Sequence, residues 1–379
     1  MRIAILANSF PPQSLGGAAK IAREQAVGLQ EQGFEVCVWL PEPYNTHEDI
    51  LNIKTFKPQT TFKFVDLNHT PRLYRLIFHI EDLGANLNAV EEIRNWKPDI
   101  IITHNLTGCG WSTAKILQKT GIKWVHLLHD VQAFEPSGQI FYNEKTSFLK
   151  AIWRWFWSSR RKASMGSPDL VVSPSNWLLS EHIKQRFFTQ SKYQVVPNPL
   201  PDVNGFENAE IDEQPTVVFV GRLEFDKGFD LLLQAWNSVQ KSVPNCKLKV
   251  IGTGSLRYLL TKDDPRIIFC GELEHNQVME QLKTANVLVF TSRLLENYPT
   301  VLLEAISLRK NIVANDVGGV AELLNGYGYI VPPGDSAQLK QALVLSMQNP
   351  PNTAKCSELI KTHDHNKIMR QWIEIIESL

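Results

Sequence analysis

Cysteine is scarce in this chain, and long hydrophobic runs are absent. The five cysteines among 379 residues are dispersed and form no Cys-x-x-Cys pair, which excludes a disulfide framework and the usual zinc motifs. No apolar run approaches the roughly 18–20 residues that span a bilayer as a helix. The opening segment MRIAILANSF is soon interrupted by Pro11 and Pro12, unlike a secretion signal. We therefore expect free thiols and a cytoplasmic protein.

Net charge is absent as well. The 39 Lys and Arg side chains balance 39 Asp and Glu, so nothing global points to nucleic acid. Residues 1–200 nevertheless hold 22 basic against 17 acidic side chains, a net charge of +5, and residues 201–379 carry −5. The first half therefore leans toward an anionic surface or substrate. The first βα turn also lacks Gly-x-Gly-x-x-Gly, which argues against a nicotinamide oxidoreductase.

Short, nearly continuous apolar runs alternate with longer amphipathic stretches along the chain. Such β-branched runs are typical of parallel strands that are buried on both faces. A helix is expected between the first two runs, over residues 16–33, because its apolar spacing is helical and it ends at Gly33. The runs occupy 2–7, 36–40, 99–103, 123–128 and 169–173 in the first half, then 216–220, 247–251, 266–270, 286–290, 311–314 and 327–331.

The length and the repeated order of elements predict two domains. A chain of 379 residues exceeds the size at which one core usually stops growing, and the β-α order restarts after a proline-rich segment. We expect an α/β protein with two Rossmann-like domains facing each other across a deep cleft, where the carboxyl ends of the strands bind ligands. The expected parts are a domain 1–195, a linker 196–214, a domain 215–365, and a helix 366–379 that can pack back on the first domain.

Two cationic side chains follow the strand expected at 216–220. Arg222 and Lys227 lie between the end of that strand and a helix expected to begin near Gly228. Arginine offers a planar bidentate fork and lysine a point charge, and together they suit a diphosphate. A solvated pair of loop cations is the alternative.

Two carboxylates, Glu296 and Glu304, flank an apolar segment in SRLLENYPTVLLEAIS, residues 292–307. Pro299 suits the first turn of a helix, because its missing N–H would have no partner there. A helix over about 299–308 would leave Glu296 in the preceding loop and present free amides to an anion. Glu304 can face the same site from one turn further on. Helices with two acids are common, so the spacing alone leaves their role open.

Six segments of the chain are informative in their order and spacing. They are SFPPQSLGGAAKIAREQAVGLQEQGFEV, HLLHD, GRLEFDKGFDLLLQAW, VIGTGSL, TSRLLENYPTVLLEAIS and NDVGGVAELL. In these segments the chain resembles the family 4 glycosyltransferases of the GT-B fold, from residue 1 to about 345. The resemblance implies a sugar-nucleotide donor, bound mostly by the second domain, and an acceptor bound by the first.

The resemblance also implies roles for the matching residues. His129 and Glu296 are the expected catalytic residues, His129 near the transferred sugar and Glu296 on its hydroxyls. Glu304 accepts from the ribose, while Gly16 and Gly17 allow close approach of the first-domain loop to the donor phosphate or acceptor. Arg222 and Lys227 hold the donor diphosphate, aided by the segment Asn297, Tyr298, Pro299, Thr300 and Val301. Glu322 orders a second-domain loop.

Two other histidines, His104 and His126, lie at or within the strands expected at 99–103 and 123–128. His104 ends a strand at the same edge as His129, so a structural and a functional role are both open. His126 lies inside a strand, which favours a structural role.

The chemistry that the resemblance implies is hexosyl transfer with retention of configuration, without a bound metal or another cofactor. The UDP- or GDP-linked sugar is a substrate, and the Asp-x-Asp motif of metal-dependent GT-A enzymes does not occur. The leaving phosphate oxygen would take the acceptor's proton, and Glu296 would orient the sugar. Assembly of cell-surface polysaccharide or glycolipid is the expected pathway. The alternatives are a sugar-nucleotide 2-epimerase and an inactive GT-B module that binds a nucleotide or a partner.

Residues 147–163, SFLKAIWRWFWSSRRKA, combine aromatic and basic side chains. On a helix, the apolar side chains from Phe148 to Trp157 cover an arc of about 200°, with Lys150, Arg154 and Arg161 beside it. Such an arc suits an anionic membrane surface and a lipid-linked acceptor, which would make the protein peripheral on the inner face of the cytoplasmic membrane. A core helix with a solvated basic edge is the alternative.

Overall fold

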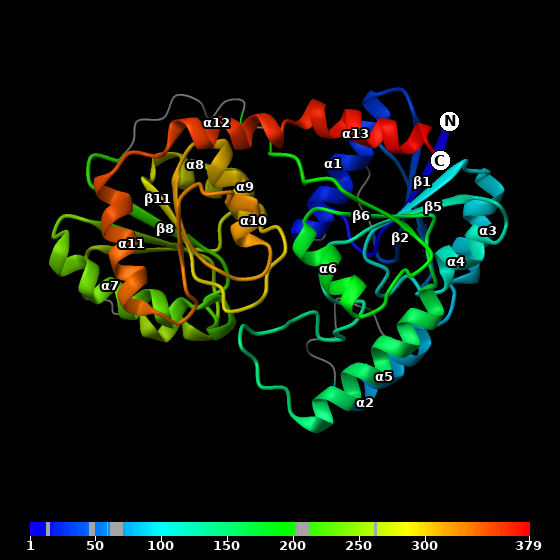
Figure 1. Cartoon of the computed structure of the whole chain (residues 1–379), viewed down its shortest axis with the longest axis horizontal. Coiled ribbons are helices and arrows are strands. Elements are labelled where there is room, and N and C mark those ends of the chain that lie inside the picture. The colour runs from blue at the N-terminus through cyan, green and yellow to red at the C-terminus, as the bar shows by residue number, and fades with distance from the viewer. Residues whose placement is uncertain are drawn as a thin grey trace. The chain divides into compact units, whose positions relative to one another are not determined.

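A computed structural model of the chain describes residues 1–12, 16–44, 50–58, 60, 71–201, 203, 212–260 and 264–379. The chain divides into two compact units (Figure 1). The first comprises Met1–Gly138, Thr146–Pro197 and Ile368–Leu379, and the second comprises Gln139–Lys145 and Asn198–Lys367. Each unit contains one parallel β-sheet with helices on it, so the expected α/β class with two Rossmann-like domains is confirmed.

The first unit contains a seven-stranded sheet in which every described pairing is parallel. The strand order is β3 (Asn52–Phe56), β2 (Glu35–Pro41), β1 (Arg2–Leu6), β4 (Ile100–Thr103), β5 (Lys123–Leu127), β6 (Leu170–Ser173) and β7 (Lys192–Val195). The helices are α1 (Gly17–Glu31), α2 (Arg72–Asp82), α3 (Leu87–Trp96), α4 (Thr113–Gln118), α5 (Phe148–Met165) and α6 (Asn176–Lys184). The last helix, α13 (His365–Glu377), buries Ile368, Met369 and Trp372 in the same core as β1 and α1.

The second unit contains a six-stranded parallel sheet. Its order is β10 (Ile267–Gly271), β9 (Lys247–Ile251), β8 (Thr216–Val220), β11 (Val287–Phe290), β12 (Asn311–Asn315) and β13 (Tyr329–Val331). The helices are α7 (Phe229–Ser242), α8 (His275–Thr284), α9 (Thr300–Ser307), α10 (Val320–Leu324), α11 (Ser336–Gln348) and α12 (Thr353–Thr362).

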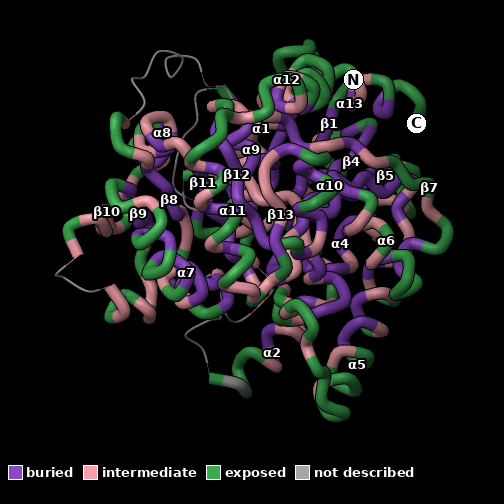
Figure 2. The backbone as a smooth tube through the Cα atoms, turned by 60° about the vertical axis from the view of Figure 1, so that its left-hand side comes forward, coloured by how far each residue is buried: buried purple, intermediate pink, exposed green. Residues whose placement is uncertain are grey.

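Side-chain alternation explains why the central strands of the second sheet are apolar. Val218 and Leu288 face the helices α8, α9, α10 and α12, while Val217 and Val287 face α7 and α11. Because both faces are covered, neither series can be polar, and β8, β11 and β12 are buried almost throughout (Figure 2). Polar side chains are therefore left to the loops at the strand ends.

Three features differ from the sequence prediction or lie beyond it. Strands β3 and β7 were not predicted, because they are the edges of the first sheet and their side chains are largely exposed or half-buried. Residues 139–145 were expected in the first domain but pack with the second unit, where the Tyr142 N–H donates to the Arg293 carbonyl at 2.8 Å. Much of the expected linker, residues 202 and 204–211, lies outside the described residues.

Candidate active site

The loops after two neighbouring strands of the second unit carry most of the expected donor-site residues. β8 ends at Val220 and is followed by residues 221–228, while β11 ends at Phe290 and is followed by residues 291–299. The two strands pair in parallel, so their carboxyl ends lie at the same edge of the sheet. Arg222, Lys227 and Glu296 are thereby brought together.

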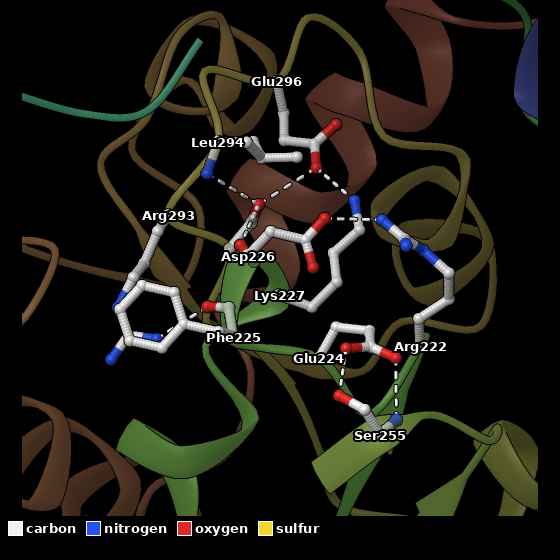
Figure 3. Close-up of polar contacts among 10 residues, drawn as sticks. Arg222, Glu224, Phe225, Asp226, Lys227, Ser255, Arg293, Leu294 and Glu296 are labelled. Carbon is white, nitrogen blue, oxygen red and sulfur yellow. Dashed lines mark hydrogen bonds and ion pairs between the residues drawn. The ribbon is translucent and has the colours of Figure 1, made fainter. Parts of the chain in front are cut away.

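Lys227 and Glu296 form an ion pair across these loops. The Lys227 Nζ lies 2.5 Å from Glu296 Oε1, and the two side chains point toward each other (Figure 3). The Ser292 hydroxyl also donates to Glu296 Oε1, at 3.0 Å, and accepts from the Leu294 N–H. Both side chains of the pair are about a quarter exposed. A ligand can therefore reach these charges, and solvent screens their electrostatic interactions only weakly.

A second pair holds Arg222 beside the first. Its guanidinium contacts Asp226 Oδ2 at 2.5 Å, and the arginine side chain is 57% exposed whereas that of Asp226 is 11% exposed. Arg222 could be predicted from the sequence, whereas Asp226 and Ser292 could not. Their signal was weak, because a single acid or serine in a loop has no spacing that marks its partner.

Arg293 fixes the two loops to each other and was also missed. Its guanidinium makes a bidentate pair with Asp230, at 2.6 and 2.8 Å, and stacks on the Phe225 ring. Its N–H donates to the Asp226 carbonyl at 2.8 Å. The loops that carry Lys227 and Glu296 are therefore cross-linked by side chain and backbone.

Two glycines permit the close approach of these loops. Gly228 has φ +68°, and a Cβ there would lie 2.0 Å from the Thr291 carbonyl oxygen. Gly318, after β12, has φ +63°, and its Cβ would lie 2.1 Å from the Glu296 carbonyl oxygen. Only glycine fits both the left-handed backbone and the missing space. The backbone of Glu296 is thus packed against a third loop, where it accepts from Gly319 N–H at 2.8 Å.

The helix expected at about 299–308 is α9, with Pro299 in the N-cap position. Proline offers no side-chain acceptor for the first amides, so the positive end of the helix is left for another anion. Thr300 and Val301 are half-buried in the first turn, and Asn297 is buried just before it. The Tyr298 hydroxyl instead contacts His363 Nε2 at 2.5 Å, and burial raises the pKa of this phenol.

Glu304 lies in the second turn of α9 and is only 5% exposed. Its Oε1 is 3.7 Å from Nδ1 of His275, the first residue of α8. Glu304 is therefore buried, unlike an ordinary solvated acid on the surface of a helix.

In the first unit, His104 and His129 form a pair at the ends of β4 and β5. The Nδ1 of His104 lies 2.8 Å from the Nε2 of His129, so one imidazole donates to the other, and the rings are stacked. Burial lowers the pKa of His129 to about 4 and also lowers that of His104, which the neighbouring His129 lowers further. Both are therefore neutral at physiological pH. His104, whose role the sequence left open, contacts the expected catalytic histidine directly.

The remaining candidates of the first unit are His126, Gly16 and Gly17. His126 is buried inside β5, and its Nδ1 lies 2.8 Å from the Thr103 hydroxyl, an arrangement that suits the structural role favoured for it. Gly16 is the N-cap of α1 and Gly17 its first residue, next to residues outside the described part of the chain. Gly16 has φ −64°, so its backbone does not itself require glycine.

The described residues contain no group of three or more His, Cys, Asp and Glu side chains arranged to hold a metal ion. Among the helices described, none has the length and apolar content to cross a membrane.

Two family models match successive parts of the chain. The model described as Glycosyltransferase Family 4 matches residues 15–202, and that described as Glycosyl transferases group 1 matches residues 203–363. Together they cover residues 15–363, which include every candidate residue above.

Similar proteins include a putative teichuronic acid biosynthesis glycosyltransferase, TuaC, of Bacillus subtilis. It is 25% identical over 89% of this chain and 87% of its own length. An uncharacterised 42.6 kDa protein in the cps region of Klebsiella pneumoniae is 25% identical, over 85% and 87% of the two chains. The Anabaena protein HepE, solved in complex with UDP, shares the GT-B fold with a TM-score of 0.68, at 18% identity and over the full length of both chains.

Proposed function

Because this chain belongs to the family 4 glycosyltransferases, we propose that it moves a hexose from a UDP- or GDP-linked donor to a hydroxyl of a glycan or lipid-linked acceptor, with retention of configuration. Its transferase class and its relation to polysaccharide-building enzymes follow from the family and from relatives such as TuaC. What we propose beyond the family is the identity of the donor, the retention of configuration and the class of acceptor. The arrangement of Lys227, Glu296 and Arg222 beside the amino end of α9 is the observation that supports it most.

Donor binding rests on positive charge at one edge of the second sheet. Arg222 and Lys227 each hold a carboxylate at 2.5 Å, and a diphosphate is a stronger anion that can join or replace those partners. The amino end of α9, with Asn297, Tyr298, Pro299, Thr300 and Val301, adds a helix dipole and backbone amides. Glu304, buried one turn further on, would accept from the ribose hydroxyls.

The leaving diphosphate gains negative charge as the glycosidic bond breaks. Lys227, Arg222 and the α9 amides would stabilise that charge, and the cross-linked loops that carry them would limit the reorganisation needed to do so. They take the part that a metal ion takes in other transferases, so we propose that the reaction needs no metal or other cofactor. The leaving phosphate oxygen would accept the proton of the attacking hydroxyl on the same face of the sugar.

Glu296 would orient the donor sugar. Lys227 and Ser292 both hold its Oε1, which leaves Oε2 to accept from sugar hydroxyls. An acid fixed in this way by a cation is a poor nucleophile, because the cation stabilises its charge. His129 would contact the transferred sugar as a neutral imidazole, and Gly16 and Gly17 would allow the α1 loop to approach the substrates.

The test is a turnover assay with a panel of UDP- and GDP-hexoses and saccharide or lipid-linked acceptors. Turnover is measured as the release of nucleoside diphosphate. We expect release with one donor base, a product whose NMR couplings show the donor's anomeric configuration, and an unchanged rate in EDTA. Inversion of configuration, or a rate abolished by EDTA and restored by Mg²⁺, would contradict the mechanism. A glycosyl adduct trapped on Glu296 would replace its orienting role with a nucleophilic one.

Transfer to a lipid-linked acceptor would take place at a membrane surface. We therefore propose a peripheral location on the inner face of the cytoplasmic membrane, for which the basic and aromatic segment 147–163 is the support.

A further inference from the structure

The amino-terminal half of α5 exposes its large apolar side chains. Phe148, Leu149 and Trp155 are 79%, 78% and 69% exposed, and Ile152, Trp153 and Phe156 are exposed as well. Of the apolar arc predicted for this segment, only Trp157 is buried. The alternative of a core helix is therefore wrong for residues 148–156, because their six large apolar side chains are exposed in the described structure.

The carboxyl-terminal half of α5 anchors the helix in the first unit. Trp157 is fully buried and its ring lies 5.4 Å from that of His79 on α2. Arg161, expected on the solvated edge, is instead buried: it donates to the Gln132 carbonyl, and its guanidinium lies over the Trp111 ring. The exposed half thus extends from a well-fixed half, so its side chains are held out as part of an ordered helix.

The helix α2 extends the same exposed surface. It lies beside α5 in both views of the chain and contacts it through His79 (Figures 1 and 2). Leu73 and Ile80, seven residues apart and so on one side of the helix, are 64% and 57% exposed. We call this surface the α2–α5 face. Its members are Leu73, Tyr74, Ile80, Phe148, Leu149, Ile152, Trp153, Trp155 and Phe156.

The exposed charged side chains described on α2 and α5 are basic. α5 contains five Lys and Arg and no Asp or Glu. Arg160 is exposed, with its guanidinium 5.3 Å from the centre of the Phe156 ring, and Arg75 is exposed on α2. The nearby acids are less accessible: Glu135 is buried and pairs with the half-buried Arg154 at 2.5 Å, Asp82 is buried, and Glu81, next to Ile80, is half-buried. A second copy of the face would place cations against cations, which disfavours a symmetric dimer.

We propose that the α2–α5 face docks on a bilayer that contains anionic lipid. Tryptophan, phenylalanine and leucine would enter the boundary between headgroups and acyl chains, and Arg75, Lys150 and Arg160 would contact the phosphates. The biological sense of this docking rests on the proposed function, since a lipid-linked acceptor lies in such a surface. The docking itself requires only the face.

The test is co-sedimentation of the full chain with vesicles of phosphatidylcholine, with and without about 30% phosphatidylglycerol. We expect binding to the anionic vesicles, and a loss of about tenfold or more in the partition coefficient for the triple variant Phe148→Ser, Leu149→Ser, Trp155→Ser. Arg160→Gln should lose about fivefold on anionic vesicles, because one surface cation contributes about that much. Two matched controls, Leu87→Ser on α3 and Lys192→Gln on β7, remove an exposed apolar and an exposed basic residue elsewhere and should bind as the native chain does.

Three results would overturn the proposal. They are no binding of the native chain to anionic vesicles, equal binding by the triple variant, and self-association of the native chain that the triple variant abolishes. Melting curves with nucleoside diphosphates, recorded without vesicles, keep the two proposals distinguishable. Failure of donor binding with intact vesicle binding would reject the proposed function and leave the docking face standing.

Discussion

His104 and His129 show how a single hydrogen bond can matter for a candidate catalytic group. Their ring nitrogens lie 2.8 Å apart, and His104 is buried while His129 is half-buried. We expect His104→Ala to lower kcat about tenfold with little change in the donor KM, because His129 would lose the partner that fixes its ring.

Asparagine can place a polar atom where the Nδ1 of His104 lies, so His104→Asn should recover most of the lost kcat. Steady-state kinetics of both variants check this expectation, with melting curves to confirm that they fold. Equal losses in the alanine and asparagine variants would assign His104 to packing alone.

The loop that carries Glu296 depends on a glycine in a neighbouring loop. A Cβ on Gly318 would lie 2.1 Å from the Glu296 carbonyl oxygen, whereas Gly326, with a similar positive φ, has open space. Both alanine variants bear the left-handed backbone cost of about 1–2 kcal/mol. Gly318→Ala should cost about 2 kcal/mol more and weaken donor binding, because the Glu296 loop must move.

Urea unfolding and diphosphate titration of the two variants provide the comparison. If Gly318→Ala and Gly326→Ala were equally stable and bound the donor equally, the close packing of the loops would be irrelevant to the site.

The interior strands of both sheets and the edges of the second sheet could be predicted from the sequence, but the edges of the first sheet could not. β1, β8 and β11 are buried on both faces and show as apolar runs, whereas β7 pairs on one side only and tolerates Lys192 and Gln194. The same reasoning located Arg222, Lys227 and Glu296 at strand ends. It could not show that Lys227 pairs with Glu296, because contacts between residues 69 positions apart depend on the register of the strands.

At the scale of the whole molecule, the first unit concentrates buried histidines. Burial lowers the pKa of His129 and His182 to about 4 and lowers those of His104 and His126. In the unfolded chain these groups have an ordinary pKa near ~6.5. Their contribution to stability is therefore complete above that value and is lost as pH falls from about 6.5 toward about 4. Burial raises the pKa of Asp82 to about 6 and also raises that of Asp130, and these two carboxyls oppose the trend.

We expect the free energy of unfolding of the first unit to fall between pH 7 and pH 4.5. The slope has an upper limit of about 1.4 kcal/mol per pH unit for each histidine. Tryptophan fluorescence during urea unfolding reports on this unit, which holds every tryptophan except Trp236. A free energy that stays constant or rises on acidification would show that these imidazoles are accessible to protons in the folded state.

The proposed function depends on the binding of a nucleoside diphosphate by the second unit through Lys227 and the α9 region. Its most direct test is a thermal-shift series with UDP, GDP, ADP and NAD on the native chain, Lys227→Ala, Glu304→Ala and the surface control Lys241→Ala. At about 100-fold over its dissociation constant a ligand adds about 2.7 kcal/mol, enough to raise the melting temperature by several degrees. We predict a shift with UDP or GDP alone that persists in Lys241→Ala and is lost in the other two variants. No shift with any diphosphate, or an equal shift in Lys227→Ala, would contradict the account.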